Sequence, residues 1–431
     1  MKKYNSLIVV LLIIVEALSL FFFHKKGILD QQSNSLLFFF SGLLIGLTGI
    51  YKFYGVKPES GLRVVRKKSI LFVGLISLIF ISITGFWANK IIEGLPINIQ
   101  FSDIIPAIQI MVKRLFSGEY PYSPLTELGY TAPAGYMPLH WLPFSVADVF
   151  NFDYRFVPLV VFWIASLVVS IRAIRAGPLY FTISIALLTG AFFLIKSFED
   201  GIISMTVELL IASYYMLFIS GLNQRNKILE GAGIALCVLS RYSLLLWLPI
   251  WLFTYLLTRQ IKKLAIVSAT IFFFVLVIYI IPFLSKDWTL FSTTASSYAH
   301  LSWEWQHLND QKQPIHLYNG VGFAHLFYEK YGGADYMSGF HLARKAFFIA
   351  NACCILLLAT WYWRIRKNLD QRIFLLYSFK IYLTVFFSFI MVPYVYLLAT
   401  SVFVSITIWS EQSRYRYSQK KSHLPAALND N

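Results

Sequence analysis

Charged residues are scarce in this chain: Asp, Glu, Lys and Arg make up 13% of its 431 residues. A soluble domain carries about 25% charged residues, because its surface must be hydrated. Hydrophobic residues reach 58%, and several uncharged runs approach the roughly 20 residues that a helix needs to cross a bilayer. The composition excludes an ordinary soluble domain and predicts an all-α, polytopic integral membrane protein.

Cysteine is also rare, and no residue pattern indicates a metal or cofactor site. The cysteines lie in apolar segments, without polar partners at metal-ligand spacing, and we expect them to be small hydrophobic residues inside helices. The histidines of the second long polar stretch follow no metal template either. These residues are Cys237, Cys353, Cys354, His300, His307, His316 and His325. Phosphate-binding glycine loops and nucleophile elbows are missing, so we predict no cofactor; a divalent metal is possible but not favoured.

Acidic residues are outnumbered, with 21 Asp and Glu against 37 Lys and Arg, which gives a net charge of +16. The basic residues gather in short loops between the apolar runs, and the densest group lies at 52–68. Such clusters in alternate loops are typical of cytoplasmic loops of membrane proteins. The excess of positive charge therefore indicates orientation in a membrane, with lipids as partners, and not a nucleic-acid partner.

Counting outward from the 52–68 loop predicts about twelve crossings, with both termini in the cytoplasm and two large extracytoplasmic loops, 89–154 and 285–343. A short hairpin turns at Ser240-Arg241-Tyr242, and a last one near Pro393-Tyr394. We divide the chain into two additional N-terminal transmembrane helices with the basic loop (1–68), a main transmembrane module (69–410) and a cytoplasmic tail (411–431). The expected crossings are 7–23, 36–54, 70–87, 155–171, 178–195, 202–219, two within 230–257, 264–284, 344–363 and two in the last hairpin.

The polar stretch 101–144 is the part of the chain where chemistry is most expected. Its first half predicts an amphipathic helix in the membrane interface, broken at Gly118. We expect Lys113 and Arg114 on its polar face to meet lipid headgroups. The segment 138–150 is either interfacial or re-entrant. The expected apolar face comprises Ile104, Ile105, Ile108, Met111, Val112, Leu115 and Phe116.

Asp103 stands at the start of this amphipathic helix and has two possible roles. A carboxylate on an outer loop close to lipid suits a general base, because partial burial can tune its pKa. Alternatively, Ser102 or Asp103 caps the helix by accepting hydrogen bonds from its first amides. The two roles do not exclude each other.

Basic residues near the outer ends of the apolar runs are candidates for binding phosphate. Arg241 lies at the tip of the short hairpin, where a cation needs an anion or water. An arginine grips phosphate with a two-pronged fork. The alternative is a side chain that snorkels to the interface. Lys196 and Lys380 are weaker candidates, the latter because no partner lies near it in sequence.

Aromatic residues crowd the first outer loop and could stack on a sugar. They also gather at bilayer interfaces for structural reasons, which is the default explanation for any one of them. The first loop contains Tyr120, Tyr122, Tyr130, Tyr136 and Trp141, and the second contains Trp288, Trp303 and Trp305.

Together these motifs resemble the GT-C superfamily of membrane glycosyltransferases, and within it the bacterial polyprenyl-phosphate-mannose-type mannosyltransferases (glycosyltransferase family 87). The likeness rests on Ser102-Asp103 before an interfacial helix, GEYPY at 118–122, YMPL at 136–139, and EGAG at 230–233 leading to Arg241. It runs from about residue 69 to 409. The chain departs from the family at 199–202, where EDGI replaces a Gly-Gln-x-Asn-like turn, and in Arg241, where lysine is usual.

The resemblance implies that 69–410 is a GT-C-like catalytic module in the bacterial cytoplasmic membrane. It would transfer a sugar (mannose or another hexose or pentose) from a polyprenyl-phosphate donor to a hydroxyl of a glycan or lipid, with inversion and without a metal. Asp103 would be the general base, and Arg241 or Lys196 would bind the donor phosphate. The implied substrate-binding residues are Tyr120, Tyr122, Tyr136 and His140.

Two other functions use the same features. A transporter or flippase of lipid-linked sugars has a similar number of crossings, although transporters usually show two related halves and none is evident here. A lipid-linked glycan polymerase or ligase would be expected to have its main site in a larger, later loop with paired arginines. In this chain only Arg344-Lys345 resembles such a pair.

Overall fold

The computed structural model describes residues 2–24, 29–55, 58–59, 67–174, 177–196, 201–224, 226–290, 292, 321–331, 336–391, 394–412 and 416–417. Most of these residues are helical, loops such as 118–137 connect the helices, and one antiparallel pair of two-residue strands is present, β1 (Pro58–Glu59) and β2 (Arg416–Tyr417). Most of the basic 52–68 loop, most of the second outer loop and nearly all of the tail lie outside the described residues.

The main helices follow the apolar runs of the sequence. They are α1 (Lys2–His24), α2 (Gln31–Phe53), α3 (Lys67–Gly94), α7 (Phe156–Ala173), α8 (Pro178–Lys196), α10 (Glu208–Leu222), α11 (Lys227–Val238), α12 (Leu248–Leu257), α13 (Ile261–Val275), α16 (Tyr336–Ile365), α17 (Gln371–Phe389) and α18 (Val395–Gln412).

A helix therefore lies over each of the twelve expected crossings, and the hairpin in 230–257 turns where it was predicted to turn. Six helices of the described chain are long and apolar enough to cross a membrane, and four apolar helices are shorter. These lengths support a helical membrane protein, while twelve crossings stays a prediction.

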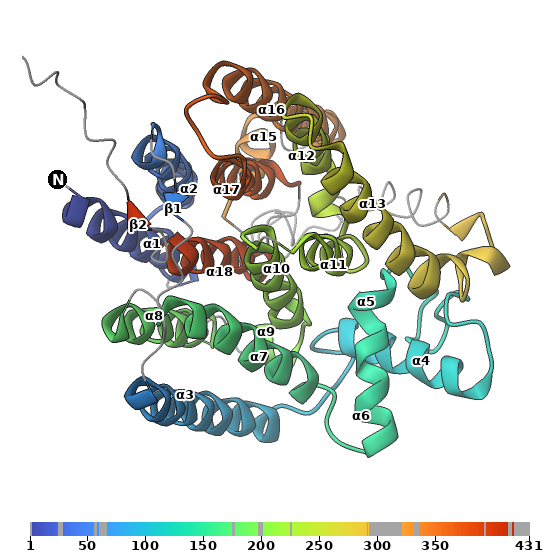
Figure 1. Ribbon diagram of the computed structural model, residues 1–431. Helices are drawn as coiled ribbons and strands as arrows, with labels where there is room; N and C mark the ends of the chain where they lie inside the picture. The colour runs from blue at the N-terminus through green and yellow to red at the C-terminus, as the bar shows by residue number, and fades with distance from the viewer. Residues whose placement is uncertain are drawn as a thin grey trace, which may run out of the picture.

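Shorter elements connect or flank these helices. They are α4 (Ile104–Ser117), α5 (Pro138–Trp141), η1 (Leu142–Phe144), α6 (Ser145–Phe150), α9 (Gly201–Ser204), η2 (Tyr242–Trp247), η3 (Leu276–Ile280), η4 (Leu284–Lys286) and α15 (Ala324–Tyr331). In Figure 1, where several main helices are seen nearly end-on, α4 and α6 lie beside the bundle and are seen from the side.

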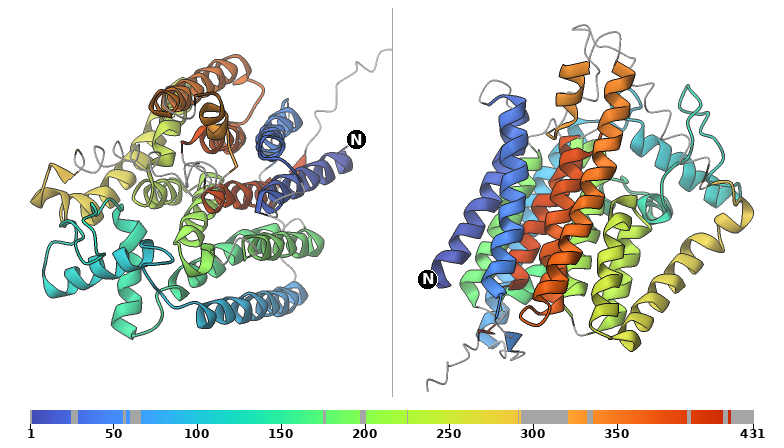
Figure 2. Two further views of the ribbon diagram at one scale, coloured as in Figure 1. Left: turned by 180° about the vertical axis from the view of Figure 1, so that it is seen from behind. Right: turned by 90° about the horizontal axis from the view of Figure 1, so that it is seen from above.

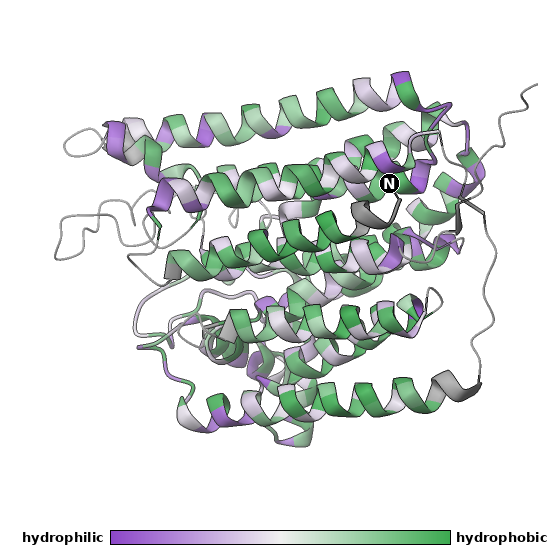
Figure 3. Cartoon of the chain, turned by 90° about the vertical axis from the view of Figure 1, so that its left-hand side faces the viewer, coloured by the Kyte–Doolittle hydropathy of each residue, from purple (hydrophilic) through white to green (hydrophobic). Residues whose placement is uncertain are grey.

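The centre of the bundle is formed by helices that are apolar on all sides. Nearly every residue of α10, α17 and α18 is buried, as expected for helices without a polar face. The helix α10 packs against α7, α11 and α18, and α17 packs against α2 and α16 (Figure 2). By contrast, α3 and α13 expose apolar side chains, including Leu71, Leu78 and Phe272. In Figure 3 hydrophobic residues cover the lengths of the helices, which fits contact with lipid tails.

The two N-terminal helices pack against the rest of this bundle. The helix α1 packs against α2 and α18, and α2 packs closely against α17. Glycines permit this approach, because a Cβ atom at Gly46 would lie 2.3 Å from the Ile381 side chain and one at Gly49 would lie 1.9 Å from the Tyr377 ring. Small residues on one helix face commonly allow such close packing in membranes.

Candidate functional site

The helix α4, which was predicted to lie in the membrane interface, buries most of its predicted apolar face against the protein itself. Ile105, Ile108, Met111 and Val112 are all buried, whereas Phe116 is 53% exposed, contrary to the prediction. The helix ends where it was predicted to end, because Gly118 adopts a left-handed conformation (φ +77°) and its amide N–H donates to carbonyls of the last turn. The apolar face of α4 therefore fixes where the following loop begins.

Arg114 does not extend toward lipid headgroups, which corrects the prediction. Its guanidinium is buried and donates to the carbonyls of Ser123 (2.6 Å) and Pro124 (2.9 Å), and it pairs with Glu127 at 2.9 Å. These two carbonyls lie outside regular structure, so a charged donor compensates for missing backbone partners. Lys113, by contrast, is exposed as expected. Arg114 thus holds the loop that carries the tyrosines.

Asp103 occupies the N-cap position of α4, but its side chain makes no capping bond. The hydroxyl of Ser102 accepts instead from the amide of Ile104, at 3.3 Å. The Asp103 carboxylate accepts a hydrogen bond from the Tyr130 hydroxyl, 2.5 Å from Oδ2, while Oδ1 has no hydrogen-bond partner among the described residues. Asp103 is therefore a partly exposed, oriented carboxylate, and the capping alternative applies to Ser102 only.

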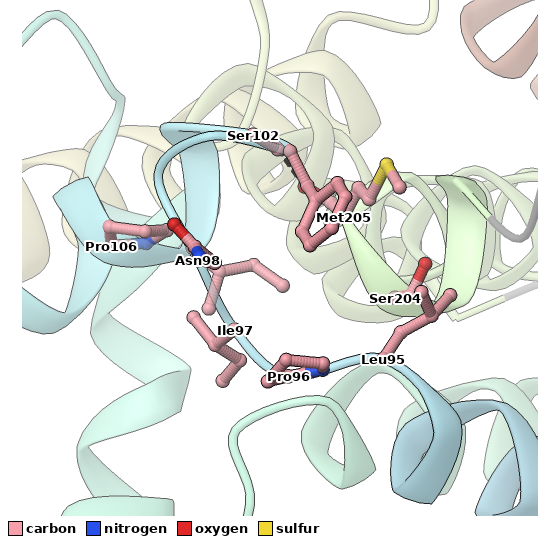
Figure 4. Close-up of a pocket in the computed structure, with 10 residues that line it drawn as sticks. Leu95, Pro96, Ile97, Asn98, Ser102, Pro106, Ser204 and Met205 are labelled. Carbon is pink, nitrogen blue, oxygen red and sulfur yellow. Dashed lines mark hydrogen bonds between the residues drawn. The ribbon is translucent and has the colours of Figure 1, made fainter.

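Ser102 joins this loop to the start of α10. Its hydroxyl donates to the carbonyl of Met205, at 2.9 Å. Beside this contact lies a hollow lined by 95–98, Ser102, Ser204 and Met205, seen in Figure 4, whose volume of about 10 Å³ suits a single water molecule. Glu208, the first residue of α10, follows Met205 by three positions, and three residues span at most about 11 Å. Glu208 therefore lies close to the loop that carries Asp103.

Arg241 is already engaged by a carboxylate. Its two terminal nitrogens donate to the two oxygens of Glu208, with Nη1 2.7 Å from Oε2. Glu208 is buried and the Arg241 side chain is 20% exposed. Sequence reasoning missed Glu208, although a lone carboxylate at the start of an apolar run has to find a partner. This pair explains how a cation is tolerated at the tip of the short hairpin.

His140 and Tyr136, both predicted to bind substrate, lie beside Arg241. Their rings stack with centroids 4.6 Å apart and planes 11° from parallel. Burial, helped by the nearby Arg241 charge, lowers the pKa of His140 to about 3, so the imidazole is neutral at physiological pH. Its Nε2 is buried and has no hydrogen-bond partner in the described part of the chain. An unsatisfied buried ring nitrogen indicates a place for a ligand group or water.

Backbone contacts explain why α5 reaches this place. Pro138 occupies the first helical position of α5, where a missing amide N–H costs nothing. The amide of Leu139 donates to the carbonyl of Leu239, at 2.8 Å, and the Tyr214 hydroxyl donates to the carbonyl of Leu139, at 3.3 Å. The last turn of α11 and the middle of α10 thus hold α5 directly beside the Arg241 turn.

A second tyrosine completes the group. Tyr396, near the start of α18, interacts electrostatically with Glu208, Arg241 and Tyr136. We call the five side chains the Arg241 cluster: Tyr136, His140, Glu208, Arg241 and Tyr396. It combines a cation, a carboxylate, a neutral imidazole and two phenols at one end of the bundle.

Tyr120 and Tyr122 do not belong to the Arg241 cluster but to an adjacent aromatic group. The Tyr122 hydroxyl accepts from the indole of Trp141 at 3.1 Å, and Trp141 follows His140 directly. The Tyr120 hydroxyl donates to the carbonyl of Phe283, at 3.1 Å, and burial together with Asp287 raises its pKa to about 12. Each hydroxyl thus makes a bond that holds the loop in place.

The remaining predicted site residues lie outside the Arg241 cluster or outside the described part of the chain. Lys196 ends α8, and its side chain lies outside the described residues. Lys380 is fully buried and pairs with Glu16 of α1, which supplies the partner that its sequence neighbourhood lacks. Of the four loop histidines only His325 is described, with Nδ1 2.7 Å from the Gly322 carbonyl oxygen. Among the described residues, no group of three or more His, Cys, Asp and Glu side chains could hold a metal ion.

This end of the bundle can therefore offer an oriented carboxylate for proton transfer, a guanidinium for an anion and stacked rings for a sugar or another flat apolar face. In comparisons with known proteins, no family model, no curated protein and no solved structure matches the chain.

Proposed function

We propose that the chain is a membrane glycosyltransferase that uses a polyprenyl-phosphate sugar and an acceptor hydroxyl of a glycan or lipid. The observation that supports this most is the position of Asp103: a partly exposed carboxylate, oriented by Tyr130, on a loop tied to the segment that leads into the Arg241 cluster. A lipid-linked donor suits this place, because α4 and α6 lie beside the bundle and α6 exposes Val149 and Phe150.

In the proposed reaction Asp103 removes the proton of the acceptor hydroxyl. The acceptor oxygen forms a bond to the anomeric carbon as the bond from that carbon to the donor phosphate oxygen breaks. The lipid phosphate leaves with the bonding electrons, and the configuration inverts because one displacement occurs. General-base catalysis of this kind typically contributes ~10²–10⁴-fold.

Arg241 is the proposed partner of the leaving phosphate. Glu208 occupies one N–H of each terminal nitrogen, which leaves the other guanidinium donors for an anion. The buried Nε2 of the neutral His140 lies beside it, and the Tyr136 ring covers the imidazole. Oriented donors at a site shielded from water stabilise a developing charge most effectively.

The proposal places this end of the bundle outside a bacterial cytoplasmic membrane and both termini in the cytoplasm. Its support is the alternation of basic loops along the sequence. A donor embedded by its lipid tail needs no nucleotide on that side.

The decisive experiment incubates purified protein with a radiolabelled polyprenyl-phosphate sugar and an extract of envelope acceptors. Release of free polyprenyl phosphate, together with label in a new product, is expected. If the labelled donor instead crosses a vesicle membrane without being cleaved, the protein is a transporter and the proposal is wrong.

Transport is the second candidate because of one observation. Glu16 and Lys380 form an ion pair at zero exposure between α1 and α17, and Ser405 donates to Glu16 at 2.7 Å. Ionisable pairs inside membrane helices often lie on the path of a transported ion or proton. Transport of a lipid-linked sugar across the membrane of proteoliposomes, if the variant Lys380→Met abolishes it, would favour this candidate.

A further inference from the structure

A second polar site lies at the far end of the bundle from the Arg241 cluster. The helix α10 begins with Glu208 beside Arg241, and its fifteen residues extend about 22 Å to the loop before α11. There the loops α10–α11, α12–α13 and α16–α17 surround a cavity of about 470 Å³. Cavities of roughly 300–1,000 Å³ are typical of sites for small molecules.

Basic side chains dominate the charged lining of this cavity. Its cations are Lys227, Lys263, Arg366 and Arg372, against one lining carboxylate, Asp370. Two of the four cations are neutralised locally. Lys227 pairs with the buried Glu230 at 2.6 Å, and Arg372 pairs with Asp370 at 3.3 Å.

The other two cations have no acidic partner among the described residues. Lys263 donates to the side-chain oxygen of Gln260, at 2.8 Å, and Arg366 donates to the backbone carbonyl of Trp363. Their positive charges are therefore not compensated by a carboxylate of the described residues, and both side chains line the same cavity. A cavity with two free cations attracts an anion that carries more than one negative charge or several acceptor oxygens.

The walls of this cavity are fixed before any ligand arrives. The side-chain amide of Gln260 donates to Gln371 at 2.6 Å and to Thr258 at 3.0 Å, and Gln371 donates in turn to Thr254 at 3.1 Å. These bonds hold the α12–α13 loop against the start of α17. A site fixed in this way loses less entropy when a ligand binds.

We propose that this cavity binds a phosphate-bearing anion, supplied either by the headgroup of an anionic membrane lipid or by a soluble phosphate compound. Arginine and lysine together are typical of phosphate recognition, since the guanidinium gives directed bonds and the ammonium a compact charge. The exposed Ile261 and Trp363, each 54% exposed on helices next to the cavity, fit the depth of lipid headgroups. The site is separate from the Arg241 cluster and does not depend on the proposed transferase activity.

The test variant is Lys263→Ala/Arg366→Ala, which removes the two lining cations that no described carboxylate pairs with. Lys263 is exposed, and the Arg366 guanidinium contacts the backbone carbonyl and the ring of Trp363, three residues before it, so the variant is expected to fold. The matched control is Lys286→Ala/Lys345→Ala, two exposed lysines toward the other end of the bundle. It removes the same total charge and so controls for general surface electrostatics. Lys263→Arg/Arg366→Lys keeps the charge and should retain binding.

Two probes distinguish the sources of the phosphate. Inorganic pyrophosphate is titrated against detergent-purified protein by microscale thermophoresis, and native mass spectrometry counts phosphatidylglycerol retained from nanodiscs that also contain phosphatidylcholine. At least one probe should bind saturably, and the test variant should weaken it by ~10-fold or more for each lost charge-assisted bond. Pyrophosphate binding identifies a soluble ligand, and selective phosphatidylglycerol retention identifies a lipid. Equal binding by the test and control variants, or no saturable binding of either probe, overturns the proposal.

Discussion

The Glu208 carboxylate accepts hydrogen bonds from both terminal nitrogens of Arg241. The cation that we propose binds the donor phosphate is therefore also half of a structural ion pair. A buried charge whose partner is removed is costly, and loss of one side of such a pair typically destabilises a protein by 3–5 kcal/mol. Activity measurements on a single Arg241 variant would therefore mix a binding effect with a folding effect. The first prediction separates the two.

Arg241→Ala should lower both thermal stability and donor use, because Glu208 is left buried without its cation. Glu208→Leu/Arg241→Leu should recover most of the stability, since apolar residues of similar size often replace such pairs at little cost. The double variant should still fail to use donor. Arg241→Lys should keep more activity than Arg241→Ala, because a point charge keeps part of the attraction. Donor use by the double variant at the wild-type rate would leave Arg241 with a structural role only.

Asp103→Asn and Asp103→Ala should both abolish sugar transfer while leaving thermal stability nearly unchanged. The structural reason is that the Asp103 side chain makes no capping bond. Ser102→Ala is the matched control, because Ser102 supplies the cap and should cost about 1 kcal/mol. The transfer assay is repeated on the wild-type protein with a chelator, because loss of activity there would indicate that Asp103 is a metal ligand. Wild-type transfer by Asp103→Asn would show that the carboxylate is not the base.

The stability of the protein should rise with pH between about 3 and 6.5. Native His140 has a pKa of about 3, against an ordinary histidine value of 6.5, so over this range the unfolded chain binds a proton that the native protein does not. Its share of the slope approaches about 1.4 kcal/mol per pH unit. His140→Phe preserves a ring against Tyr136 and should flatten the profile measured by thermal denaturation. An unchanged slope would contradict the assigned environment of His140.

Lys380→Met should destabilise the bundle by roughly 3–5 kcal/mol, because Glu16 stays buried without its counter-charge. Adding Glu16→Gln should restore part of this loss, and the double-mutant cycle gives the coupling energy. Thermal denaturation in detergent measures all four proteins. Additive losses would mean that the two charges do not interact.

Cysteine labelling tests the orientation. Gly129 is a poor site for a probe because its φ is +80°, so the exposed Thr131 is the better choice for the first outer loop. Thr131→Cys should react with an impermeant reagent added outside intact cells, and the exposed Lys262→Cys should react only after lysis. Both are made after replacement of the three native cysteines by alanine. The reverse pattern would invert the topology.

The sequence predicts the helices far better than the contacts between them. Apolar runs locate the segments, and the turn at 240–242 is visible because polar residues interrupt one run. The pairs Glu208–Arg241 and Glu16–Lys380 join residues 33 and 364 positions apart, which no local pattern reveals. The prediction that Arg114 meets lipid was wrong because two of its partners are loop carbonyls, which leave no trace in side-chain periodicity, and the third, Glu127, lies 13 positions away in the loop.

The Glu16–Lys380 pair also has a consequence for biosynthesis. Glu16 is synthesised 364 residues before Lys380, so α1 enters the membrane without its counter-charge. An acidic residue at the centre of an inserted helix costs on the order of 3 kcal/mol, a penalty that persists until α17 arrives. Nascent chains that stop before α17 keep this defect. We expect them to be degraded faster than complete chains, because proteases act on the incompletely folded population.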